Sequence, residues 1–316
     1  MDAFRLLLKN PLSLIGLALL AGFAFVAIAA PWLAPPASSR VNPWIALPLF
    51  DVKPYQMPQQ ESVRPFEKPQ GRDVFVTTPQ PPSANHVLGT TEEHYDIYYG
   101  LVWGTRSAFQ LGVIIVAVTL VMGLLVGSLA GFFGGWLDEI LMRIVEIFLV
   151  FPQLIAIFVL SVILGRGMEN VMIAFIVFGW TPYARYIRGE VLRVKENAFV
   201  EAARACGAST GRMIFRHVLP NAIYPVIVYA SLDIGNVVLG ATALSFLGLI
   251  PEGLADWGQL IGVSRNWILG TATNPFEYWY TILYPGLAIS LFVLSWNLMG
   301  DAVRDVFDPR LRGSRR

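Results

Sequence analysis

Cysteine is almost absent from the sequence, because Cys206 is the single thiol among 316 residues. One cysteine excludes an intrachain disulfide and leaves no thiolate cluster that could hold a metal ion. The sequence also lacks the Gly-x-x-x-x-Gly-Lys-Ser/Thr loop that cradles nucleotide phosphates and the His-Glu-x-x-His pattern of zinc peptidases. A chain without the phosphate loop cannot be the ATPase of an ATP-driven machine.

Charged residues are scarce, at 14% of the chain, whereas hydrophobic residues make up 55% and the mean hydropathy is +0.57. This exceeds the apolar surface that one soluble core of this size would use. The formal net charge of +1 gives no support for nucleic-acid binding, because the basic residues gather where membrane topology places them. We therefore predict a protein surrounded by membrane lipid, with no nucleic-acid partner.

Long apolar runs supply six candidate transmembrane helices, since roughly 20 mostly apolar residues cross the hydrocarbon layer of a bilayer. The predicted spans cover residues 11–34, 109–133, 140–165, 171–187, 221–250 and 281–300. The first could instead be a cleaved signal peptide, because Arg5 and Lys9 precede it and Ala27-Ile28-Ala29 resembles a cleavage site. Its uncharged run is longer than a signal core of ~7–15 residues, so we favour a retained anchor.

Positive charges orient the spans, because Lys and Arg accumulate in short cytoplasmic connections. Basic side chains gather between the fourth and fifth spans and in the C-terminal tail: Arg185, Arg188, Arg193, Lys195, Arg204, Arg212, Arg216, Arg304, Arg310, Arg312, Arg315 and Arg316. The connection 251–280 contains only Arg265, together with tryptophans and tyrosines that favour a membrane interface. With an even number of spans, we expect both termini in the cytoplasm.

The stretch 35–106 is a polar insertion between the first two spans and contains eleven of the chain's 21 prolines. Such a composition predicts an extended, extracytoplasmic segment. The chain therefore divides into a cytoplasmic N-terminus with the first helix (1–34), this insertion (35–106), a helical core (107–303) and a basic cytoplasmic tail (304–316).

Several residues inside the spans stand out. Gly123, Gly127 and Gly131 remove side chains from one stripe and predict close packing against another helix. Pro152 and Pro182 predict kinks in the third and fourth spans.

Charges inside or beside the spans form a second group. Asp233 in the fifth span is costly in lipid, so it either lines a cavity or pairs across helices, or else lies near the interface. Arg143 and Glu146 have i,i+3 spacing and predict a local ion pair.

The segment 199–221 is a basic, amphipathic connection hinged at a glycine. Its first part places small or apolar residues on one helical face: Phe199, Ala202, Ala203 and Cys206. Glu201 in the opening turn suits the helix dipole, Gly207 can reverse the chain, and Ser209 can cap a second helix that presents Met213, Ile214 and Val218 before Pro220. From the residues alone, these two short helices fit an element that lies on the membrane surface and an element that docks to a partner equally well.

The order Glu201-Ala202-Ala203, three residues, Gly207, then eleven residues to Leu219-Pro220 resembles the EAA motif of ABC importer permeases. Five further stretches match: Lys9-Asn10-Pro11-Leu12, His86-Val87-Leu88-Gly89-Thr90, Leu244-Ser245-Phe246-Leu247-Gly248, Asn297-Leu298-Met299-Gly300-Asp301 and Asp308-Pro309-Arg310-Leu311-Arg312. Together they are similar to the second, C-type subunit of the dipeptide/oligopeptide/nickel permease family. Two departures are the longer insertion and the stretch Thr91-Glu92-Glu93-His94-Tyr95-Asp96, which replaces the family's Gly-Arg-Asp-containing stretch.

The resemblance implies an all-α polytopic membrane protein with six transmembrane helices and the type I ABC importer permease fold, in the cytoplasmic (inner) membrane of a bacterium or archaeon. It implies a coupling helix at 198–218 whose contacts with an ATPase come from Glu201, Ala202, Ala203, Arg204, Gly207, Leu219 and Pro220. The implied partners are a second permease subunit, two ABC ATPase subunits that bind ATP and Mg, and an extracytoplasmic solute-binding protein. This chain would bind no cofactor, and its cargo would be peptides, or alternatively a nickel chelate or an oligosaccharide.

One pattern points elsewhere, because Gly207-Ala208-Ser209-Thr210-Gly211 matches the G-x-S-x-G elbow of hydrolases. That chemistry needs a strand-turn-helix setting with a positioned His and acid, which a connection between helices does not offer. A membrane enzyme would need clustered catalytic residues, and a passive anchor would need no docking element. We therefore predict a noncatalytic transporter subunit.

Overall fold

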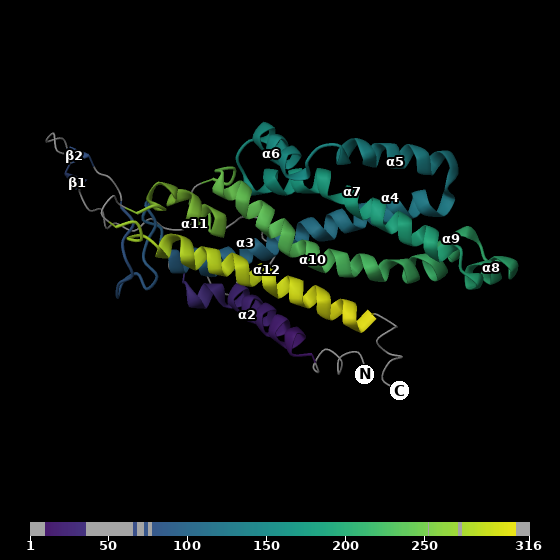
Figure 1. The fold of residues 1–316 in the computed structure, drawn as a ribbon, viewed down its shortest axis with the longest axis horizontal. Helices are drawn as coiled ribbons and strands as arrows, with labels where there is room; N and C mark the ends of the chain where they lie inside the picture. Colours follow the sequence, from purple (N-terminus) through teal and green to yellow (C-terminus); the bar gives the residue numbers. More distant parts are fainter. Residues whose placement is uncertain are drawn as a thin grey trace.

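The computed structural model describes residues 10–35, 66–67, 73–74, 78–251, 253–270 and 274–307. Over these residues the protein is a bundle of helices that run back and forth along one long axis (Figure 1). In chain order the helices are α2 (Pro11–Leu33), α3 (Ile97–Phe109), η1 (Gln110–Ile114), α4 (Ile115–Phe133), α5 (Gly135–Leu149), α6 (Gln153–Leu164), α7 (Met168–Lys195), α8 (Ala198–Ala205), α9 (Thr210–Arg212), η2 (Met213–Val218), α10 (Leu219–Phe246), α11 (Trp257–Val263), η3 (Arg265–Trp267) and α12 (Tyr280–Phe307). Two short antiparallel strands, β1 (Phe66–Glu67) and β2 (Asp73–Val74), are the other regular elements.

Four helical stretches of the described chain are long and apolar enough to cross a membrane: Pro11–Leu33, Ile97–Phe133, Thr210–Phe246 and Tyr280–Asp305. The pair α5 and α6 would make a fifth span if its two halves, bent by 81°, count together. Helix α7 has 28 residues, but Glu169, Arg185 and the basic residues of its last turn lower its hydropathy. The number of six spans therefore stays a prediction.

The second span begins earlier than the sequence pattern indicated. We expected it to start at Phe109, with the insertion reaching residue 106, whereas α3 begins at Ile97 and continues through η1 into α4. Asp96 starts the helix, because its carboxylate accepts hydrogen bonds from the backbone N–H groups of Tyr98 and Tyr99. The sequence pattern did not indicate α3, because the polar and aromatic residues of this helix interrupt the apolar run. The rest of the predicted insertion lies largely outside the described residues.

Pro152 breaks the third predicted span, as expected. The residue precedes α6 with φ −56° and ψ 116°, and its carbonyl accepts from the N–H of Ile155 at 3.0 Å. Pro182, by contrast, lies inside the continuous helix α7. Pro152 therefore separates α5 from α6, whereas Pro182 does not end α7.

The glycine stripe of α4 lies directly against α7. A side chain at Gly127 would meet Ile187 and the carbonyl of Ala184, and one at Gly131 would lie 2.9 Å from the carbonyl oxygen of Arg188. The predicted close packing is confirmed, and it makes α4 and α7 one of the most intimate pairs in the bundle. The main core lies between these helices, α6 and α10.

The connection between α10 and α12 packs into the bundle rather than spreading over it. Trp257 of α11 is buried, and its indole N–H donates to the carbonyl of Leu101 at 3.1 Å. Asp256 caps α11 by accepting from the N–H of Gln259 at 3.1 Å, and burial raises the pKa of this carboxyl. These contacts fix α11 against α3 and α10 and so shape the end of the bundle opposite α8.

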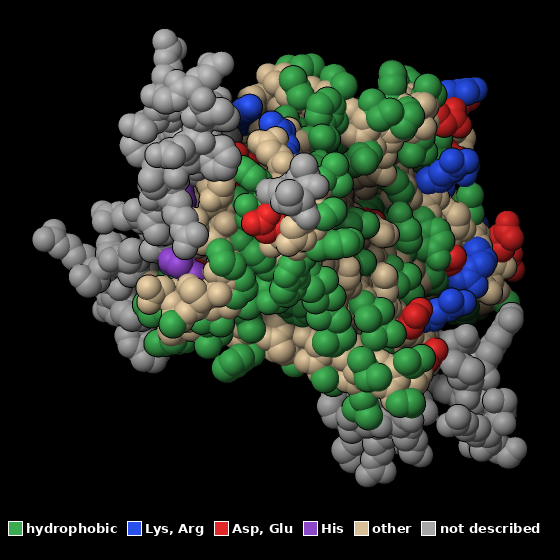
Figure 2. Space-filling model, turned by 60° about the vertical axis from the view of Figure 1, so that its left-hand side comes forward, with side chains coloured by type: hydrophobic (Ala, Val, Ile, Leu, Met, Phe, Trp, Pro, Cys, Tyr) green, Lys and Arg blue, Asp and Glu red, His purple; other side chains and the backbone are tan. Residues whose placement is uncertain are grey.

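The surface carries the signature of a protein in lipid. Figure 2 shows hydrophobic side chains over the middle of the visible face, with charged side chains along its right-hand margin and a smaller number toward its upper left. Large apolar residues are strongly exposed there and elsewhere, among them Val150 at 76% and Ile163 at 74%. Such a band would be unfavourable in water but suits hydrocarbon.

Candidate functional site

The predicted docking segment projects from one end of the bundle. Helices α8 and α9 lie together at the end opposite α11, beyond the last turns of α4 and α7 (Figure 1). The segment therefore stands clear of the apolar middle of the molecule. Its position suits contact with a partner outside the membrane.

Gly207 reverses the chain as the sequence predicted. Its φ of +78° lies in the left-handed region. The N–H of Gly207 donates to the carbonyl of Arg204 at 3.0 Å, and the N–H of Ala208 donates to that of Ala203 at 3.1 Å. This pair of bonds is a Schellman motif, in which glycine is favoured because a Cβ would strain the backbone. The motif ends α8 and sets its angle to the next helix.

The second helix differs from the prediction in two respects. Ser209 occupies the N-cap position of α9, but its side chain forms no capping hydrogen bond within the described part of the chain. In addition, the second helix does not end before Pro220: this proline lies in the first turn of α10, which continues α9 and η2 in one helical stretch from Thr210 to Phe246. Residues 213–218 are wound as a π-helix just before the proline, which cannot donate a backbone hydrogen bond.

One side of the segment is anchored and the other is open. Val200, Met213 and Val218 are buried, at 0%, 7% and 1% exposure, and join the main core. The residues expected to face a partner are all exposed or half-buried, as are two neighbours on the same helix: Glu201, Ala202, Ala203, Arg204, Gly207, Leu219 and Pro220, with Phe199 and Cys206. Whether these residues touch an ATPase stays a prediction.

Two residues of this segment escaped the sequence reasoning. Val200 carries α8 on the core, and Phe215 points away from it with 73% exposure. The sequence did offer a signal, because both are large apolar residues outside the apolar faces that we predicted. Val200 stands between Phe199 and Glu201, and Phe215 follows Ile214. An apolar residue outside the predicted apolar face therefore either anchors the helix on the core, as Val200 does, or stays exposed, as Phe215 does.

Polar contacts brace the base of the segment. The guanidinium of Arg188 donates to both carboxylate oxygens of Asp138 at 2.6 Å, joining α7 to the start of α5. The ammonium of Lys195 donates to the carbonyl of Phe132 at 2.6 Å, joining the end of α7 to α4. Asn197 closes α7 by donating to the carbonyl of Val194. The contacts of Arg188 and Lys195 were not predicted, because they connect residues far apart in sequence.

The bidentate ion pair between Arg188 and Asp138 should stabilise the protein measurably. We expect Arg188→Ala to lower the free energy of unfolding by about 1–2 kcal/mol, because charge-assisted bidentate bonds exceed ordinary surface pairs. The matched control is Arg143→Ala, since the pair of Arg143 with Glu146 at 3.2 Å is 71% and 59% exposed and should contribute less than about 0.5 kcal/mol. Thermal melting of the purified protein measures both, and equal shifts would contradict the assignment.

Asp233 lies on α10 and is bonded across the bundle. The hydroxyl of Tyr183 on α7 donates to its carboxylate at 2.8 Å, and the ring of Tyr183 packs edge-on against Tyr229 at 5.1 Å. The geometry matches an interhelical polar contact. A role of Asp233 in a translocation path stays a prediction.

The hydrolase-like pattern has no catalytic setting. Gly207 to Gly211 form the turn between two helices, and Ser209 is exposed there without a strand before it. Within the described residues, no group of three His, Cys, Asp or Glu side chains is placed to hold a metal ion. The described surroundings of Ser209 therefore offer no arrangement of the hydrolase type.

Comparisons with known proteins agree with this geometry. The profile of the binding-protein-dependent transport system inner membrane component family matches residues 123–313, and the N-terminal TM domain of oligopeptide transport permease C matches residues 1–58. The dipeptide transport system permease protein DppC of Alkalihalophilus pseudofirmus is 33% identical over 98% of this chain and 90% of its own. The probable D,D-dipeptide transport system permease protein DdpC of Escherichia coli is 37% identical over 74% of this chain and 76% of its own.

Among solved structures, an inward-facing MetNI methionine ABC transporter matches with a TM-score of 0.53 and 23% identity. The match covers 66% of this chain and 97% of the other. At that identity the likeness shows the fold alone, which is the type I ABC importer permease fold expected from the sequence.

Proposed function

Because the chain belongs to the family of binding-protein-dependent transport system inner membrane components, we propose that it is a permease subunit that carries peptides inward. With a second permease subunit it forms the path across the cytoplasmic membrane, and separate ATPase subunits drive the cycle. The observation that carries this proposal is α8, held on the core by Val200 while its small-residue face stays open. The chain itself is not catalytic.

The coupling step follows from the shape of the segment. Closure of two ATPase subunits around ATP and Mg would draw the coupling helices of the two permeases together. Because Lys195 and Arg188 tie α7 to α4 and α5, a displacement of α8 would move these helices as one body. Such coupling requires that ATP bind the inward- and outward-facing states with different affinity.

We place α8 in the cytoplasm together with both termini. Helix α2 begins and α12 ends toward the end of the bundle that carries α8 (Figure 1), and Asn10 donates to Asp305 at 3.3 Å. The same end collects the arginines and lysines between α7 and η2, as the distribution of positive charge requires. The α11 end then faces outward, where a solute-binding protein would deliver the cargo.

Peptides are the proposed cargo because relatives that match most of this chain are named as dipeptide and oligopeptide permeases. The test is growth of an amino-acid auxotroph that lacks its own peptide permeases and obtains the amino acid only as a dipeptide. We expect growth when this chain is expressed with its partner subunits and none when it is omitted. Growth on the free amino acid is the control. Failure of the complete set to support dipeptide uptake would overturn the proposal.

A further inference from the structure

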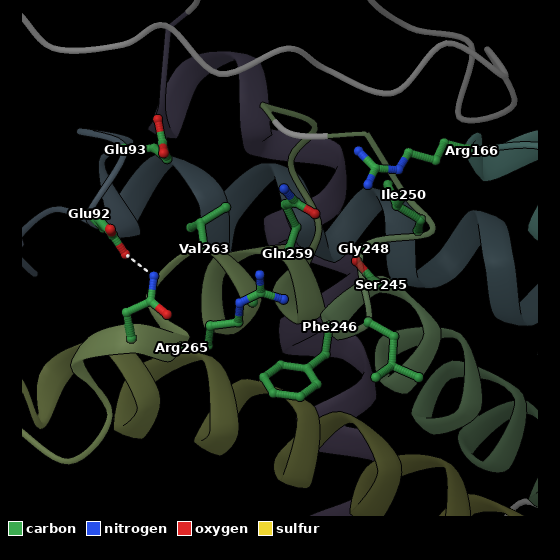
Figure 3. Close-up of a pocket in the computed structure, with 13 residues that line it drawn as sticks. Glu92, Glu93, Arg166, Ser245, Phe246, Gly248, Ile250, Gln259, Val263 and Arg265 are labelled. Carbon is green, nitrogen blue, oxygen red and sulfur yellow. Dashed lines mark hydrogen bonds between the residues drawn. The ribbon is translucent and has the colours of Figure 1, made fainter. Parts of the chain in front are cut away.

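A polar pocket of about 180 Å³ opens at the α11 end of the bundle. It lies between the loop before α3, the turn from α6 to α7, the end of α10, and α11 with η3 (Figure 3). Its polar side chains come from all of these elements: Glu92, Glu93, Arg166, Ser245, Gln259, Arg265 and Asn266. The pocket is thus assembled by tertiary structure at the end opposite α8.

Charges of both signs line the pocket without forming ion pairs among the described residues. Figure 3 shows Glu92 and Glu93 on one side, Arg166 on the other and the guanidinium of Arg265 extending toward the middle. Among the described residues, none of these four side chains forms an ion pair within 4.0 Å. Two separated charge types facing one space suit a ligand that carries both a cation and an anion.

The carboxylates are not equivalent. Glu92 accepts a hydrogen bond from Asn266 at 3.4 Å, and burial raises the pKa of Glu92 although hydrogen bonding and the positive charge of Arg265 partly offset the rise. Glu93 has no hydrogen bond to a described residue, so it is the carboxylate open to a ligand. The guanidinium groups of Arg166 and Arg265 likewise have no hydrogen bond to a described residue, and they are open to a ligand from the other side.

We propose that this pocket binds the two free ends of a short peptide as it enters the permease, with Arg166 and Arg265 facing the α-carboxylate and Glu93 facing the α-ammonium. Guanidinium groups bind carboxylates through parallel, charge-assisted hydrogen bonds. The inference rests on the proposed function and names the chemistry by which this chain would recognise its cargo.

Size and chemistry narrow the ligand further. The pocket volume of about 180 Å³ gives room for a ligand of dipeptide size. A neutral oligosaccharide would leave the charges unmatched. Exposure of Arg166 and Arg265 to solvent keeps binding weak, as release into a transport path requires.

The experiment measures binding of alanyl-alanine to the complete complex of permeases and ATPases in nanodiscs, without the solute-binding protein, by saturation-transfer NMR. The variant Arg166→Gln/Arg265→Gln should bind alanyl-alanine roughly tenfold more weakly than the wild type. The matched control is Glu169→Gln, an exposed carboxylate at the same end that does not line the pocket and should change nothing. Alanyl-alanine amide, which lacks the carboxylate, should bind the wild type roughly tenfold more weakly and lose nothing further in the variant.

Several results would overturn the inference. These are undetectable binding to the wild type, equal losses for alanyl-alanine and its amide in the variant, or unchanged peptide binding with weakened docking of the solute-binding protein. The last result would make the pocket a protein-docking surface. Dipeptide-dependent growth of the wild type is scored separately, so the proposed function can stand when this inference fails.

Discussion

Replacement of Glu201 by lysine is expected to lower solute-stimulated ATP hydrolysis and peptide uptake roughly 30-fold, the effect of losing about 2 kcal/mol at the centre of an interface. Glu201 is exposed in the first turn of α8, and its side chain has no hydrogen bond or ion pair with a described residue. The substitution should therefore spare the fold, apart from about 0.3–1 kcal/mol of lost interaction with the helix dipole. The measurements are co-purification of the ATPase subunits and hydrolysis in proteoliposomes.

A matched substitution separates docking from a general effect of charge. Glu139→Lys places the same change on the exposed surface of α5, outside the predicted docking segment, and should leave hydrolysis within about twofold. A second variant, Gly207→Val, should also uncouple the complex, because φ of +78° strains any residue with a Cβ although the space around Gly207 is open. Normal co-purification and hydrolysis in both Glu201→Lys and Gly207→Val would remove α8 from the coupling interface.

Replacement of Gly127 by leucine should cost about 3 kcal/mol or more of the free energy of unfolding and lower the melting temperature by roughly 6–12 °C. A Cβ at this position would overlap Ile187 and the backbone carbonyl of Ala184, and backbone cannot move aside as a flexible side chain can. The helices α4 and α7 would have to separate. Melting of the purified protein in detergent measures the change.

The control for packing is a glycine in another span with free space around it. A Cβ at Gly22 of α2 would meet no neighbouring atom within 4 Å, so Gly22→Leu should have little effect or a slightly favourable one through helix propensity. A melting temperature unchanged by Gly127→Leu would show that α4 and α7 are not packed as described. Equal losses at Gly22 and Gly127 would mean that leucine is harmful in any span.

The membrane setting and the two-helix shape of the segment around Gly207 could be predicted because their causes are local. Apolar runs of sufficient length, the reversal at Gly207 and the faces of Met213 and Val218 depend on residues close together in sequence. The start of the second span was predicted too late, because the cap at Asp96 is a single side chain before an aromatic stretch. The cap at Ser209 was wrong for a related reason, since a residue type permits a hydrogen bond without requiring one.

The sequence by itself determined that this protein lies in a membrane, that helices fill it, and that a small-residue helix follows the fourth predicted span. Hydrophobicity and backbone preferences act over a few helical turns, so the elements that depend on them can be predicted from the order of residues. Only the tertiary structure decided that Val200 anchors α8, that Arg188 reaches Asp138, and that Glu93 and Arg265 face one pocket. Those contacts join residues distant in sequence, and their geometry depends on how the helices pack.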